Sequence, residues 1–138
     1  MGWGLVRCSS GCGVEHREEI VSSCIVVNIL GQEYRIIFGQ VTDPRLETAD
    51  GYCDFTTKQI VVRSDIPETV DTVADLDVYK NKVLRHEIIH AFLYESGLDS
   101  NSWGSNEEVV DWIALQLVKI VQVVDKVNNE LKKGQKDV

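Results

Sequence analysis

The sequence predicts an α+β fold, in which a small antiparallel or mixed sheet of about three to four strands packs on two helices. Two observations lead to this expectation. Short runs of β-branched residues, separated by turn residues, fill much of the first half of the chain. Apolar residues at helical spacing fill the second half. Strand-forming segments followed by helical segments are typical of α+β domains.

Length and composition indicate one globular domain. The chain has 138 residues, which is enough to bury a core without disulfide bonds. Its apolar fraction of 43% and charged fraction of 26% are ordinary for a globular protein. We therefore expect a single domain over residues 1–138, with a poorly defined N-terminal segment (1–24) and a C-terminal tail (133–138).

Charge and hydropathy exclude several classes of partner. The net charge of −8 argues against nucleic-acid binding, because an acidic chain repels a phosphate backbone. No run of residues is long and apolar enough to cross a bilayer, and the start of the chain lacks the pattern of a cleavable signal. These features predict a cytoplasmic protein whose four cysteines are reduced.

Two β-hairpins are predicted in the first half of the chain. Segments 25–30 and 34–38 are apolar and β-branched, and a glycine turn separates them. Segments 52–55 and 59–63 form the second pair, of which the latter strand is rich in β-branched residues. The stretch 41–51 between the hairpins holds Asp-Pro and Asp-Gly pairs, which predict a loop.

Two helices are predicted in the second half. The first spans about 76–95 and ends before Gly97, a residue that commonly terminates helices. A polar loop covers 98–104, and a longer helix follows over about 106–132. The apolar residues of this second helix recur at helical spacing: Val110, Ile113, Ala114, Leu117, Val118, Val121 and Val124.

The first helix carries a His-Glu-x-x-His motif. His86 and His90 are four residues apart, so both imidazoles lie on one face of the helix and reach one metal ion. Glu87 lies one position further round, where its carboxylate can accept a proton from a metal-bound water. These polar residues interrupt an otherwise apolar helix, and buried polar groups require partners. The motif therefore predicts one Zn²⁺ per chain, with Glu87 as general base.

A third protein ligand is expected from the second helix. Glu107 is in phase with its apolar stripe, whereas Glu108 is in phase with solvent-facing residues. Ser105 and Glu108 also fit a capping box, which gives Glu108 a structural role. We therefore assign Glu107 as the ligand. Asp111 lies one turn further on and is the expected partner of a histidine N–H.

His86-Glu87-x-x-His90 followed by Asn106-Glu107-x-x-x-Asp111 resembles the gluzincin pattern of zinc metallopeptidases. The small size, the short linker and the upstream hairpin look most like compact phage and prophage metallopeptidases of the ImmA/IrrE type, over roughly residues 50–115. This resemblance implies a zincin-like fold and a cytoplasmic endopeptidase of a bacterial host or its phage. It also implies a protein or peptide substrate, such as a repressor-like regulator.

Peptidases of this architecture hold a peptide as an added strand along the edge of a sheet. The candidate edge is the segment 52–62, and in particular the strand residues Ile60, Val61 and Val62. A donor for the developing oxyanion is also required. The candidates are Tyr94, Tyr52 and His16, and the sequence does not choose among them.

Weaker patterns leave alternatives open. Cys8, Cys12, His16 and Cys24 offer four metal-binding side chains, but their spacing matches no defined zinc module. The runner-up to the peptidase is a non-catalytic phage regulatory or interaction protein in which zinc only stabilises the fold. An intact Glu87 disfavours that function, since a structural site needs no base beside its metal. A hydrolase of small molecules is a third alternative, although the ligand set does not match nucleobase deaminases.

Overall fold

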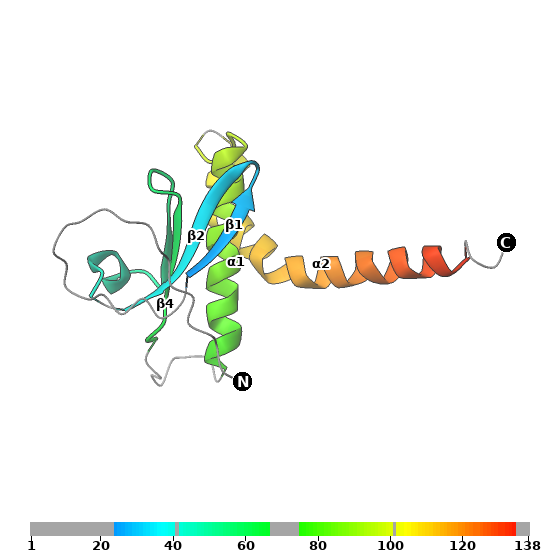
Figure 1. Cartoon of the computed structure of the whole chain (residues 1–138), viewed down its shortest axis with the longest axis horizontal. Helices are drawn as coiled ribbons and strands as arrows, with labels where there is room; N and C mark the ends of the chain where they lie inside the picture. Colours follow the sequence, from blue (N-terminus) through cyan, green and yellow to red (C-terminus); the bar gives the residue numbers. More distant parts are fainter. Residues whose placement is uncertain (1–23, 41, 67–74, 101, 135–138) are drawn as a thin grey trace.

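The computed structural model describes residues 24–40, 42–66, 75–100 and 102–134 and has the predicted α+β fold (Figure 1). A four-stranded sheet precedes two α-helices, of which the second is long. The elements are β1 (Cys24–Ile29), β2 (Gln32–Gly39), the 3-10 turn η1 (Pro44–Glu47), β3 (Gly51–Asp54), β4 (Gln59–Arg63), α1 (Leu76–Glu95), the 3-10 turn η2 (Trp103–Ser105) and α2 (Glu107–Gly134).

The sheet is mixed, with the strand order β1-β2-β4-β3. The pairs β1–β2 and β3–β4 are the two predicted antiparallel hairpins, and β2 and β4 join them in parallel. The prediction that Ile60, Val61 and Val62 form an edge strand is wrong, because β4 lies between β2 and β3 and all three side chains are buried. A strand covered on both faces is apolar throughout, as these three residues are. Of the strands in the described ranges, β1 and β3 lie at the edges.

The tight turn between β1 and β2 lies at Leu30 and Gly31, so the predicted glycine turn is confirmed. Both residues have positive φ, of 49° and 89°, which is the conformation of a two-residue hairpin turn that matches the twist of the strands. The Asn28 side chain accepts a hydrogen bond of 3.0 Å from the Gly31 N–H. This turn fixes the register in which Ile29 faces the core.

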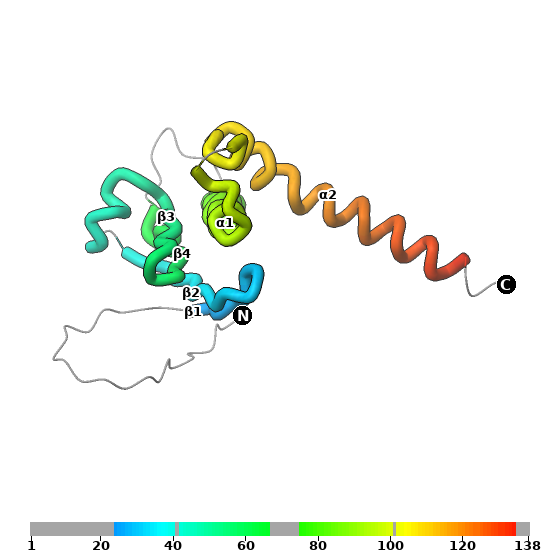
Figure 2. The backbone as a smooth tube through the Cα atoms, turned by 90° about the horizontal axis from the view of Figure 1, so that it is seen from above, coloured from blue at the N-terminus to red at the C-terminus, as the bar shows by residue number. Residues whose placement is uncertain are grey.

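The sheet lies between α1 and the segment that contains η1 (Figures 1 and 2). On the α1 side, Ile36, Ile60 and Val62 form a buried cluster with Ala91 of α1. On the other side, Leu46 of η1 is fully buried. A Cβ at Gly39 would meet both Leu46 and Val61, so the chain approaches the sheet closely at this point. Both faces of β4 are therefore covered.

The position of α1 is set at both ends. Asp75 caps the first turn by accepting hydrogen bonds from two backbone N–H groups, and Gly97, with φ of 76°, follows the last turn. The buried Tyr34 of β2 donates a hydrogen bond of 2.6 Å to Glu95 at the end of the helix. Lys58 forms an ion pair with the same carboxylate. These contacts hold the histidine-bearing helix against the sheet.

The first turns of α2 pack on α1, with Val110 and Ala114 buried against Ile89 and Leu93. The rest of α2 projects away from the body of the molecule (Figures 1 and 2). Within the described ranges, neither helix meets the length and apolarity needed to cross a membrane.

The predicted capping box at the start of α2 is wrong. Asn106 is the capping residue, because its side-chain oxygen accepts hydrogen bonds from the N–H groups of Glu108 and Val109, at 2.9 and 3.3 Å. Ser105 belongs to η2, and its hydroxyl donates to the Ser102 carbonyl instead. A short amide side chain directly before the helix therefore takes the role that the sequence assigned to Ser105.

Candidate metal centre

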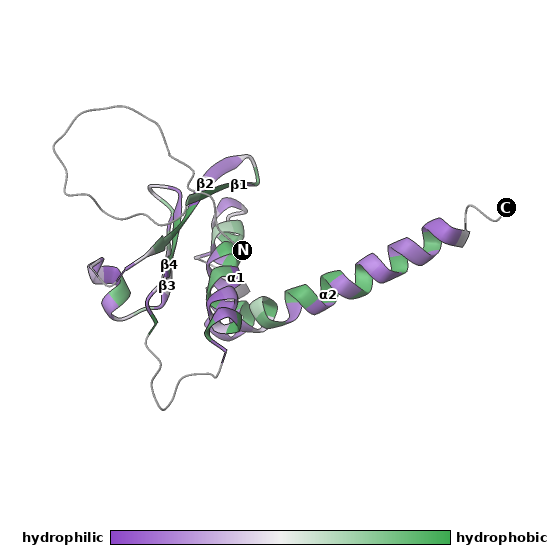
Figure 3. Cartoon of the chain, turned by 60° about the horizontal axis from the view of Figure 1, so that its bottom comes forward, coloured by the Kyte–Doolittle hydropathy of each residue, from purple (hydrophilic) through white to green (hydrophobic). Residues whose placement is uncertain are grey.

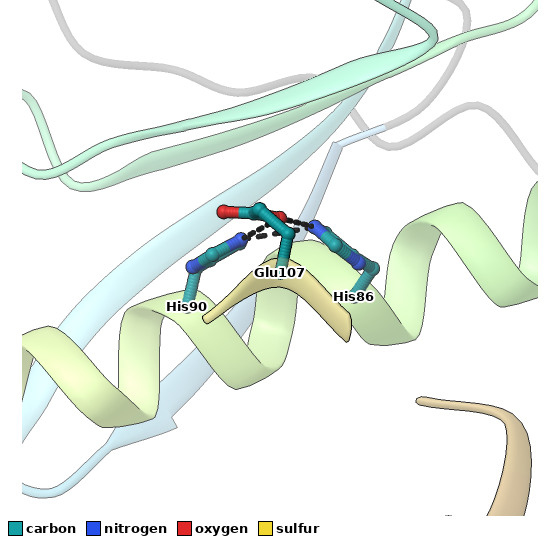
Figure 4. Close-up of side chains that lie close together, drawn as sticks. All are labelled: His86, His90 and Glu107. Atoms are coloured by element: carbon teal, nitrogen blue, oxygen red, sulfur yellow. Dashed lines mark hydrogen bonds and ion pairs between the residues drawn. The ribbon is translucent and has the colours of Figure 1, made fainter. Parts of the chain in front are cut away.

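Three potential ligand atoms converge between α1 and α2 (Figure 4). His86 and His90 extend from one face of α1, and Glu107 reaches them from the first turn of α2. The His86 Nε2 and His90 Nε2 atoms are 2.9 Å apart. The Glu107 Oε2 atom lies 3.0 Å from the first and 3.3 Å from the second. Within the described part of the chain, this is the one such group of three metal-binding side chains.

The arrangement fits a zinc ion in both size and chemistry. Nitrogen and oxygen ligands at zinc-binding distance in a tetrahedral site lie about 3.3 Å from one another, close to the three separations found here. Two imidazoles and one carboxylate form a three-ligand set that leaves a fourth position for water or substrate. The two histidine side chains are largely buried, with 18% and 19% exposure, whereas Glu107 is 68% exposed. The site is therefore largely buried on the α1 side and exposed to solvent on the α2 side.

Asp111 orients His86. Its carboxylate lies 2.9 Å from the His86 Nδ1 atom. An ionised carboxylate can only accept a hydrogen bond, which favours the tautomer that carries its proton on Nδ1 and leaves the Nε2 lone pair for a metal ion. Lys82 also forms an ion pair of 3.1 Å with Asp111. Partial burial opposes ionisation of Asp111, but the hydrogen bonds from Lys82 and His86 hold its pKa below the ordinary value. This contact favours the tautomer that a metal ligand requires.

Glu87 is buried beside the three ligands, with 8% exposure. Burial raises its pKa to about 7, and the negative charge of Glu107 adds to this effect while His86 opposes it. Burial also lowers the pKa of His90, which favours the neutral imidazole that a metal ion binds. The start of β3 approaches Glu87 so closely that a Cβ at Gly51 would lie 3.3 Å from the Glu87 Cγ atom and 2.7 Å from Val83. Glycine therefore allows the edge of the sheet to reach the site.

A pocket of about 290 Å³ opens beside these residues. His86, Glu87 and Asp111 line it, together with side chains that the sequence did not single out. Tyr79 and Lys82 of α1 are among them, and the Tyr79 hydroxyl donates a hydrogen bond to Asp50. Tyr79 and Lys82 precede His86 at helical spacing on the same face of α1, which is the signal that could have found them. Nothing in the sequence could have placed Asp50 here.

The two tyrosines named as oxyanion donors make other contacts, and their role as donors stays a prediction. Phe55 lies in the turn between β3 and β4. The Tyr94 ring stacks on the Phe55 ring, with ring centroids 4.2 Å apart. The Tyr52 hydroxyl donates to Asp43, and the Arg45 guanidinium lies over its ring at 4.0 Å from the centroid. Tyr52 lines a different pocket, which also contains Asp43, Arg45 and Val61. Neither tyrosine lines the pocket beside Glu87.

Other predicted residues fall outside the described residues. His16, Cys8 and Cys12 lie in the segment 1–23, so a second metal site that includes them stays a prediction. Cys24 is the first residue of β1. Comparison of the chain with protein-family models, with curated proteins and with solved structures gave no match.

Proposed function

We propose that this protein is a zinc-dependent hydrolase, and specifically a metallopeptidase. One observation carries the proposal: a buried carboxylate, Glu87, adjoins a His86–His90–Glu107 group that is open on one side. A site that only stabilises the fold needs four protein ligands and no base. The order of these residues along the chain, which resembles that of gluzincins, favours peptide hydrolysis over other metal-assisted reactions.

In this proposal each residue has a defined role. His86, His90 and Glu107 would hold the ion, which when bound supplies Lewis acidity that lowers the pKa of a water molecule. Glu87 accepts the proton of the attacking water and passes it to the departing amine. Asp111 positions His86 and does not touch the substrate. The two proton transfers need only one side chain, because the Glu87 carboxyl group serves first as base and then as acid.

A peptide segment of a protein, such as a repressor-like regulator, is the substrate class that we propose. The edge strand β3 begins at Gly51, which lines the pocket together with Asp50 and Glu87. Among the described strands, β3 is paired on one side only, with β4. An extended peptide can add to such an edge through main-chain hydrogen bonds, and its scissile bond would then lie near Glu87.

The test combines metal analysis with a peptidase assay on a mixture of quenched fluorescent peptides. The wild-type chain is expected to bind about one zinc ion and to cleave peptides from the mixture. Glu87→Gln should retain zinc and fold but lose roughly 100- to 10,000-fold in activity, as expected for loss of a general base. His90→Ala should lose both zinc and activity.

The matched control is Glu108→Gln, because Glu108 is exposed and is absent from the described pocket and ligand group. This variant makes the same chemical change beside the site and should behave as wild type. Zinc binding with no cleavage by any variant would favour the non-catalytic regulatory protein. A chain that binds no zinc, even after zinc is added back, would contradict the hydrolase proposal altogether.

A further inference from the structure

The distal part of α2 has no partner in the described chain. Every residue from Leu117 to Gly134 is exposed. An apolar band nevertheless continues along this part of the helix (Figure 3). Exposed apolar bands of this length mark interaction surfaces, because single scattered apolar residues are ordinary but contiguous ones are not.

The band has the spacing of a coiled coil. Its members are separated alternately by three and four residues: Val110, Ile113, Leu117, Ile120, Val124, Val127 and Leu131. The first two pack against α1. The last five, which we call the α2 stripe, are exposed by 37%, 46%, 50%, 51% and 62% in that order. A strict alternation of three and four is the heptad pattern that lets helices pack side by side.

We propose that the α2 stripe is a self-association surface, at which α2 helices from two or more copies of this chain pack together. A heptad seam is complementary to a second copy of itself, because the same side chains recur at the same spacing on both helices. A half-exposed aliphatic side chain shows on the order of 80 Å² of apolar surface, so the stripe and its apolar neighbours expose roughly 500–600 Å². Two such helices would together bury roughly 1,000–1,200 Å², which reaches the lower limit of about 1,000 Å² for a specific interface.

The residues beside the stripe favour another copy over a different protein. Val121 and Val123 flank the seam and are 48% and 64% exposed. Charged residues usually occupy such flanks when a coiled coil selects a particular partner. Beside the middle of the stripe aliphatic residues stand in their place, and Glu130 is the one charged residue at a flanking position of the described helix. Leucine at one seam position and isoleucine at the next, as in Leu117 and Ile120, also favour bundles of more than two helices in parallel coiled coils.

The inference goes beyond the proposed metal centre and does not depend on it. The α2 stripe begins after Asp111, and none of its five residues lines the described pocket or belongs to the ligand group. Failure of the association experiment would therefore leave the hydrolase proposal intact, and the reverse also holds.

The experiment measures the mass of the full chain in solution by sedimentation equilibrium over a range of concentrations. Wild type is expected to show a multiple of the chain mass of 15.5 kDa. The variant Ile120→Lys/Val127→Lys should sediment as a single chain, because two charges then lie in the seam. The control Gln122→Lys/Asn129→Lys adds the same charge to the opposite face of the same helix and should keep the wild-type mass.

A milder variant, Val124→Asn, keeps the proposal testable if the double lysine variant fails to fold. Its amide side chain should raise the dissociation constant roughly tenfold or more without unfolding the body, as judged by near-ultraviolet circular dichroism. A wild-type chain that is a single copy at all concentrations would overturn the proposal. The proposal would also be overturned if the seam variants and the control had the same mass in solution. This holds whether all of these variants are associated or all are single chains.

Discussion

Asp111 shows how one residue can serve two partners in the site. Its carboxylate accepts from Lys82 and from His86, and both contacts favour the ionised form. The helical spacing of His86, His90, Glu107 and Asp111 made this group accessible to sequence reasoning, because residues three to four apart share a helix face. Lys82 lies four residues before His86 on the same face of α1, but this spacing alone does not distinguish it from the many helical lysines that face solvent. Asp50 was missed because only the folded chain brings it to α1.

The first prediction concerns Asp111→Asn. An amide cannot stabilise the His86 ring as a carboxylate does, so zinc affinity should fall by roughly 10- to 100-fold. Competition with a chromophoric chelator measures this change. Asp125→Asn, on the exposed distal part of α2, is the control and should leave the affinity unchanged. Equal affinities for the two variants would show that Asp111 does not orient the ligand.

A second prediction at this scale concerns Cys53 of β3. Burial raises the pKa of its thiol to about 12, and the carboxylate of Glu87 contributes further. At pH 8 the reactive thiolate is then roughly three orders of magnitude rarer than for an ordinary cysteine. Alkylation by iodoacetamide should therefore be slow in the folded protein and fast in urea, as followed by mass spectrometry of the Cys53 peptide. Equal rates in both conditions would contradict the raised pKa of this partly buried thiol.

The elements themselves were largely predictable, whereas their arrangement was not. Both hairpins and α1 were expected at nearly the bounds that the structure has, because each depends on local periodicity and on turn residues. The sheet order could not be derived, since the parallel pairing of β2 with β4 depends on how the hairpins pack together. For the same reason β4 was mistaken for an edge strand. The helix cap was missed because Ser105 and Asn106 are both good capping residues.

The prediction at the scale of elements concerns the link between the two ligand helices. Gly104 of η2 is buried, and a Cβ there would lie 2.3 Å from the Leu98 carbonyl oxygen and 3.1 Å from Leu93. Gly104→Ala must displace η2 and the start of α2 that carries Glu107. We expect a loss of about 1–3 kcal/mol in the free energy of unfolding, together with weaker zinc binding.

Urea denaturation and zinc titration check this expectation. Gly134→Ala is the control, because a Cβ at that position meets nothing within 4 Å. The control should have wild-type stability and zinc affinity. Unchanged zinc affinity in a destabilised Gly104→Ala protein would show that the η2 turn does not set the position of Glu107.

The whole molecule consists of a body, in which α1 lies on the sheet, and an α2 helix that extends beyond it (Figure 1). The proposed zinc site joins the two helices through His86, His90 and Glu107. A ligand that binds only the folded state stabilises that state by mass action. The metal centre is therefore expected to contribute to global stability as well as to chemistry.

The prediction at this scale is a rise in the melting temperature on addition of zinc. Zinc at 100 times its dissociation constant should stabilise the folded chain by about 2.7 kcal/mol. Glu107→Gln should lose most of this rise, whereas Glu108→Gln should retain it, because only Glu107 lies within reach of the histidines. Differential scanning calorimetry with and without a chelator provides the measurement. A rise of the same size in both variants would place the zinc elsewhere.

The residues of the proposed site are close together along the chain as well as in space. His90 and Glu107 are 17 residues apart, and His86 and Asp111 are 25 apart. Tyr34 and Glu95, which fasten the sheet to α1, are 61 apart. Closing a short loop costs less entropy than closing a long one, so the two helices can meet early in folding, before α1 docks on the sheet. An ion captured at that stage would act as a nucleus for folding, and the supply of zinc would then govern how fast the protein matures.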